Sequence, residues 1–270
     1  VERFENKFYE MLRLHRANVE EFEIVRYENI DQSIKGRKVF ISMYDELKFC
    51  FLVAKDVERK LMAKKEIEEQ IGDEELVKIA YLVFFMGIGV KSGLLTKDLF
   101  NIKHETFLGE YLQALADLQK EYRGAKKISI HSGEMTLTED LSNFTTHFEL
   151  NIKYLPFSGH ISRLGHYYRH LFQTVKYVAE QEEKIIPNKY IYLKTLRAQL
   201  STHEQLFLYY NALSVLGEPW LKNGYLTEYR MIKNIPLPMA SFGIYPKKKL
   251  GDKNSKGELL FEWDEIKKRV

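Results

Sequence analysis

The sequence has 270 residues, a net charge of +3 from 41 Lys and Arg against 38 Asp and Glu, and a single cysteine, Cys50. So small a charge gives no electrostatic argument for nucleic acid as the partner, and one cysteine excludes an internal disulfide, which fits a reducing cytoplasm. No run of about 18 apolar residues occurs, so the sequence predicts no helix that spans a membrane.

Apolar residues that recur at three- and four-residue spacing predict helices through the first half of the chain. The predicted helices cover residues 1–22, residues 37–69, a stretch that carries residues 79–87, and residues 103–122. Asp73 is predicted to cap the third of them. Residues 23–36 are predicted to form a polar connection and residues 91–103 a connector.

The second half begins with residues 123–156, which lack periodicity and are rich in Ser, Thr and Gly. This composition predicts an irregular insertion that holds a short strand at 148–154 or a short β hairpin. The predicted helices that follow are residues 157–181, 188–201 and 202–216. A helical domain of residues 1–245 is predicted to end in a polar tail, 246–270, mobile over 247–256. Long helices joined by short turns predict an all-α helical bundle.

Three segments of the chain have a distinctive wording and order. They read FENKFYEMLRLHRANV followed by GRKVF at residues 36–40, then LGHYYRHLFQTVKYV at residues 164–178, then YLKTLRAQLSTHEQLFLYYNALS at residues 192–214. In order and spacing these segments resemble the AbiC-like family of phage abortive-infection proteins, and the resemblance spans residues 3–235.

The resemblance implies a role in bacterial anti-phage defence, in which an infected cell is arrested or dies before the phage mature. It also implies that a hydrophobic membrane segment and a helical linker precede residue 1. A chain that starts at Val1 inside a predicted helix agrees with such an upstream segment. We therefore expect a cytoplasmic domain, which the full-length protein anchors to the inner membrane. The resemblance names a biological role and not a reaction.

The polar side of the helix predicted at 157–181 carries the first candidate residues. Arg163, His166, His170 and Tyr177 recur there at three-, four- and seven-residue steps. The spacing of the two histidines is one that zinc sites use. Tyr167, however, stands where a metalloprotease has its Glu, and no third ligand is evident. The sequence thus predicts no metal and no cofactor.

A ribonuclease of the metal-independent HEPN type is one hypothesis for the mechanism. Such enzymes use an Arg to hold the phosphate and a nearby His to move a proton near neutral pH. Two spacings fit, Arg163-x6-His170 and Arg197-x5-His203. The predicted catalytic residues are His166, Arg169, His170 and Arg197, with RNA as the partner. The alternative interpretation of these residues is a solvated polar face.

A non-enzymatic effector or sensor module that binds a phage or host protein is the other hypothesis. The predicted binding residues are His15, Arg163, Tyr167, Tyr177, Gln199 and Asn211. A buried polar side chain must be hydrogen-bonded. His15, Gln199 and Asn211 can therefore also be read as satisfied structural residues. The 17 Tyr and 17 Phe favour a homodimer. An enzyme site requires His166 and His170 to share one cleft with Arg197.

Overall fold

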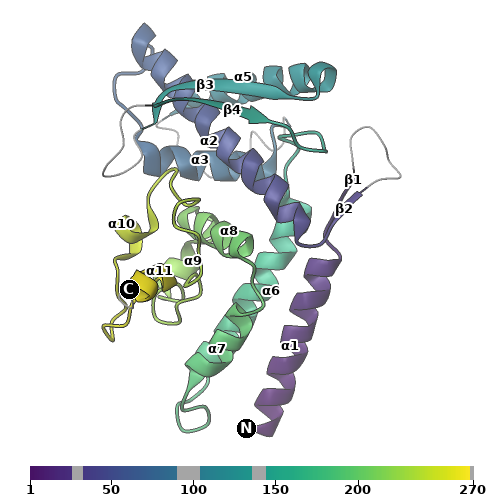
Figure 1. Cartoon of the computed structure of the whole chain (residues 1–270), viewed down its shortest axis with the longest axis vertical. Coiled ribbons are helices and arrows are strands. Elements are labelled where there is room, and N and C mark those ends of the chain that lie inside the picture. The colour runs from purple at the N-terminus through teal and green to yellow at the C-terminus, as the bar shows by residue number, and fades with distance from the viewer. Residues whose placement is uncertain (26–32, 90–103, 136–143, 268–270) are drawn as a thin grey trace.

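The computed structural model describes residues 1–25, 33–89, 104–135 and 144–267, and helices make up most of them (Figure 1). Within these ranges two small antiparallel strand pairs accompany the helices. The prediction of a helical bundle with a small β insertion is confirmed. None of the helices in the described ranges is long and apolar enough to span a membrane.

The first half holds four of the described helices and the first strand pair. They are α1 (Glu2–Glu20), β1 (Glu23–Val25), β2 (Ser33–Lys35), α2 (Lys38–Lys64), α3 (Asp73–Met86) and α5 (Glu105–Ala125). The predicted polar connection thus contains the β1–β2 pair, and the predicted connector lies outside the described residues. Helix α2 ends before the predicted Glu69 because Lys65 adopts a left-handed conformation with φ of 58°. Asp73 is the first residue of α3 and pairs with Lys55 at 2.7 Å, whereas Gly72 is the cap.

The predicted insertion is an antiparallel hairpin of β3 (Ile128–Met135) and β4 (Phe144–Leu150), with Ile128 opposite Leu150. Both strands contact α2, and β3 also contacts α5, so the hairpin covers one side of these helices (Figure 1). The strand predicted at 148–154 starts earlier, at Phe144, and ends at Leu150.

The second half is helical throughout most of its described length. Its elements are α6 (Ile161–Ala179), α7 (Lys189–Arg197), α8 (Thr202–Leu213), α9 (Glu218–Lys222), α10 (Pro246–Leu250) and α11 (Glu262–Lys267). Ser201 caps α8, because its hydroxyl accepts from the Glu204 amide and the Glu204 carboxylate accepts from the Ser201 amide. Helix α6 begins at Ile161 and not at Phe157, since Phe157 and Gly159 both have positive φ angles.

Two glycines allow the end of α3 to meet the loop that precedes α6. A Cβ atom on Gly159 would lie 2.6 Å from the Met86 carbonyl oxygen, and one on Gly87 would lie 2.7 Å from that of Ser158. The amide of His160 donates to the Phe85 carbonyl across this contact at 2.8 Å. Since both glycines also have φ near +88°, the close approach requires glycine at both positions. The contact fixes the last turn of α3 beside α6.

The C-terminal segment, predicted to be a mobile tail, packs against the helices. Leu260 and Phe261 are buried. Lys247 pairs with Asp264 at 2.5 Å, and Lys249 pairs with Glu74 of α3 at 2.6 Å. Of these two ion pairs, the one formed by Lys249 links the segment to α3. The domain boundary at residue 246 stays a prediction.

Candidate functional site

Four of the predicted site residues meet where α1, α6 and α8 converge. His15 of α1 is 1% exposed, and its ring lies 5.4 Å from that of Tyr167 and 6.3 Å from that of His170, both on α6. The Tyr167 hydroxyl donates to Oε1 of Glu204 at 3.1 Å, and His15 Nε2 lies 3.9 Å from the same oxygen. The Glu204 carboxylate is therefore the buried acceptor that joins the three helices.

Gln199, the fourth predicted residue, closes this junction from the turn before α8. Its side-chain oxygen accepts from Arg16 Nε at 2.8 Å, and its carbonyl accepts from the Arg37 guanidinium. The same guanidinium donates to Oε2 of Glu204 at 3.2 Å. The two arginines that bind Gln199 thus come from parts of the chain outside the turn that holds it. These contacts agree with the alternative interpretation of Gln199 as a satisfied structural residue.

Both histidines of the junction favour the neutral form. Burial lowers the pKa of His15 to about 4, and the neighbouring His170, Arg37 and Arg16 act in the same direction. Burial and His166 lower the pKa of His170 as well. Within the described chain neither ring nitrogen of either residue has a hydrogen-bond partner. A neutral imidazole can accept a proton, but at 1% exposure His15 is closed to a substrate.

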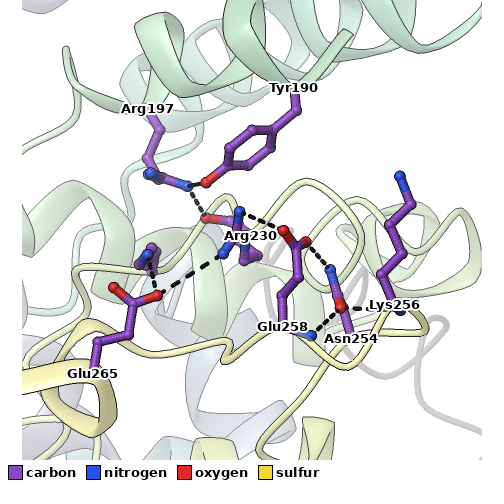
Figure 2. A network of polar contacts seen from close by, with 8 residues as sticks. Tyr190, Arg197, Arg230, Asn254, Lys256, Glu258 and Glu265 are labelled. Carbon is purple, nitrogen blue, oxygen red and sulfur yellow. Dashed lines mark hydrogen bonds and ion pairs between the residues drawn. The ribbon is translucent and has the colours of Figure 1, made fainter. Parts of the chain in front are cut away.

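Arg197 lies in a different network, which Figure 2 shows. Its guanidinium, on a residue 6% exposed, donates to the Arg230 carbonyl at 2.9 Å and to the Tyr190 hydroxyl at 3.5 Å. The Arg230 guanidinium stacks over the Tyr190 ring at 4.3 Å and reaches Glu258 at 3.3 Å and Glu265 at 3.9 Å. Arg197 therefore ties α7 to the main chain at Arg230, whose own side chain reaches the C-terminal segment. None of these contacts involves His166 or His170.

Three more predicted binding residues hold one element to another. Arg163 donates to the carbonyl of Glu23 in β1 at 2.8 Å. Tyr177 stacks on Phe4 of α1, with the ring centroids 5.3 Å apart. Asn211, which is buried, donates to the hydroxyl of Tyr81 in α3 at 3.0 Å. The remaining two candidates, His166 and Arg169, are exposed on α6.

A pocket of about 380 Å³ opens beside a second face of α6. Its lining consists of Phe85, Met86, Ile161, Gly165, Tyr168, Arg169, Phe172, Asn211, Leu216, Pro219 and Trp220. Arg169 is the one charged residue of this lining, and it makes no hydrogen bond or ion pair with any residue of the described ranges. Ile161 and Leu216 are 51% and 37% exposed, which gives the pocket an apolar rim. This combination suits a ligand with an apolar body and a negative charge.

The aromatic walls of this pocket and the buried pair of Glu46 and His160 were not predicted from the sequence. Glu46 of α2 is fully buried and lies 2.8 Å from Nε2 of His160. Its position three residues after Met43 and one before Leu47, on the apolar side of the helix, was the available signal. In the part of the chain that the structure describes, no three His, Cys, Asp or Glu side chains stand where they could hold a metal.

The comparisons with known proteins point to the same region. Residues 159–239 match the model of a family described as "Putative phage abortive infection protein". No curated protein and no solved structure gives a significant match. Nine of the eleven pocket-lining residues lie within 159–239, and the matched segment holds two of the three motif segments of the sequence. Over residues 159–239 the chain is thus similar to a family of phage abortive-infection proteins, and this similarity supports a general role in anti-phage defence.

Proposed function

We propose that the protein acts in anti-phage defence as an effector or sensor module that binds a phage or host protein at the pocket beside α6. One observation carries the proposal. The family-matching segment builds most of a pocket whose single charged group, Arg169, has no partner in the described chain. Arg163 and Arg197, by contrast, each donate to a main-chain carbonyl of another segment.

The composition of the pocket and its rim supports a protein partner. Trp, Tyr and Arg are the residues that most often dominate the binding energy of protein interfaces, and here Trp220, Tyr168 and Arg169 share one lining. Exposed Ile161 and Leu216 extend the apolar surface beyond the pocket. An apolar patch around a concave centre is typical of an interaction site.

Reversing the charge of Arg169 is expected to reduce partner recovery about tenfold, because a carboxylate replaces the cation that this residue contributes to the pocket. The measurement is a quantitative pull-down of the tagged protein from infected cells, with mass spectrometry, for wild type and Arg169→Glu. Lys194→Glu, at an exposed position of α7 outside the pocket, is the matched control. Equal recovery of the partner with wild type and Arg169→Glu would show that the partner binds outside this pocket. Infections by several phages that yield no specific partner would contradict the proposal.

The ribonuclease hypothesis receives less support from the contacts of its residues. It needs an Arg and a His that reach one phosphate, whereas Arg197 is buried against the Arg230 carbonyl. His170 is partly buried against His15. We therefore expect the purified protein to leave total and transfer RNA intact, as judged by gel electrophoresis. Cleavage that His166→Ala or Arg169→Ala abolishes, with helical circular dichroism unchanged, would replace the binding proposal by an enzymatic one.

A further inference from the structure

We infer that the pocket beside α6 receives an acidic peptide segment of the partner, in which a large aromatic side chain fills the pocket and an adjacent carboxylate pairs with Arg169. This inference rests on the proposed function, since it specifies the chemistry of the partner at the same pocket. Size, wall composition, charge and rim each contribute to it.

The size and walls of the pocket suit one large side chain. A volume of about 380 Å³ lies near the lower end of the range of about 300–1,000 Å³ typical of ligand pockets, so the space is too small for a helix. Phe85, Phe172 and Trp220 contribute aromatic rings to the lining. Phe172 and Trp220 already meet edge to face, with centroids 5.3 Å apart. A further ring can extend this packing, since aromatic pairs favour that geometry.

The charge of the lining selects an anion. Arg169 is exposed and its guanidinium offers five N–H donors in a planar fork, which matches a carboxylate. Among the described residues of the lining there is no Asp or Glu that would repel a carboxylate or attract a cation. Asn211 is committed to Tyr81, and the hydroxyl of Tyr168 is buried, so Arg169 remains the group that sets the charge preference.

The rim favours a peptide over a free small anion. Ile161 and Leu216 belong both to the lining and to the exposed surface. A small molecule held inside the pocket would leave their outer sides in water. The residues that flank an anchoring side chain in a peptide can cover them, which removes additional apolar area from water.

Trp220 provides a direct readout of occupancy. The chain has two tryptophans, and the other, Trp263, is 49% exposed on α11, so Trp263→Phe leaves Trp220 as the sole reporter. In this background, acetyl-Phe-Asp-amide is titrated against acetyl-Phe-Asn-amide and acetyl-Ala-Asp-amide while Trp220 fluorescence is recorded. We expect the Phe-Asp peptide to bind about fivefold more tightly than the Phe-Asn peptide, the worth of a partly exposed ion pair. The Ala-Asp peptide should bind more weakly still.

Matched substitutions assign the preference to Arg169. Arg169→Gln should make the Phe-Asp and Phe-Asn peptides bind equally, whereas Lys194→Gln should preserve the fivefold difference. Equal binding of the Phe-Asp and Phe-Asn peptides to the protein that retains Arg169 would overturn the inference. So would the absence of a saturable signal at millimolar peptide. If 3-phenylpropionate bound as tightly as the Phe-Asp peptide, the pocket would recognise a free organic anion, which also overturns it.

The two proposals fail in distinguishable ways. A pull-down that depends on Arg169, together with no preference between the peptides, would leave the proposed function standing and remove the acidic-peptide inference. A clear preference for the Phe-Asp peptide, together with a pull-down that is insensitive to Arg169→Glu, would leave the peptide preference of the pocket standing. It would remove the pocket as the proposed partner interface.

Discussion

Glu46→Ala is expected to lower the free energy of unfolding by about 3–5 kcal/mol, because it removes a buried carboxylate that three buried polar groups use as their acceptor. The fully buried carboxylate accepts from the Tyr154 hydroxyl at 2.6 Å, from the Phe157 amide at 2.6 Å and from Nε2 of His160 at 2.8 Å. Alanine leaves three buried polar groups without this acceptor and adds a cavity. The segment that leads into α6 would lose its link to α2.

Urea denaturation followed by circular dichroism measures this loss. Glu110→Ala, at an exposed position of α5, is the matched control and should change the free energy of unfolding by less than about 0.5 kcal/mol. A loss of under about 1 kcal/mol for Glu46→Ala would mean that Tyr154, Phe157 and His160 find other partners, and would show the assigned role of Glu46 to be wrong.

The buried His15 is expected to make the protein less stable in acid. Its pKa is lowered from 6.5 to about 4 in the folded state, so the unfolded chain takes up the proton first as the pH falls. The stability that depends on neutral His15 is therefore fully present above pH 6.5 and is lost as the pH falls toward 4. A shift of this size corresponds to about 3 kcal/mol. Glu204, His170, Arg37 and Arg16 are the ionisable groups around the ring.

Comparison with His15→Phe isolates this effect, because carboxylates titrate in both proteins and their contributions cancel. The free energy of unfolding of each protein is measured by urea denaturation from neutral pH down to pH 4. The difference between wild type and His15→Phe should shift by about 3 kcal/mol over that interval, in favour of His15→Phe in acid. Parallel curves for the two proteins would show that His15 does not carry the acid sensitivity.

Helix α1 and most of α6 were predictable because each has one periodic apolar face. The predicted start of α6 at residue 157 was wrong because Phe157 has a positive φ, which its residue type does not indicate. The prediction that the C-terminal segment is mobile over 247–256 was wrong for another reason. Lys249 pairs with Glu74, a carboxylate 175 positions away, and composition gives no signal for a partner so distant in sequence.

The sequence predicted which residues belong to the candidate site better than it predicted which of them lie together. Periodicity tells which residues share a helix face, but not which helix that face meets. His15 and His170 were therefore named as candidates without their contact, and Arg197 was grouped with His170 although it binds the Arg230 carbonyl. Trp220 escaped notice because α9 has only five residues, too few for a periodic pattern.

The pocket joins parts of the chain that are far apart in sequence. Phe85 and Met86 belong to the last turn of α3, whereas Trp220 belongs to α9 and Arg169 to α6. An occupant that touches all three binds the assembled arrangement and has no equivalent site on the unfolded chain. By mass action it raises the melting temperature, and above its dissociation constant the gain grows with the logarithm of its concentration. Thermal-shift screening can therefore search for the natural ligand without any knowledge of the downstream biology.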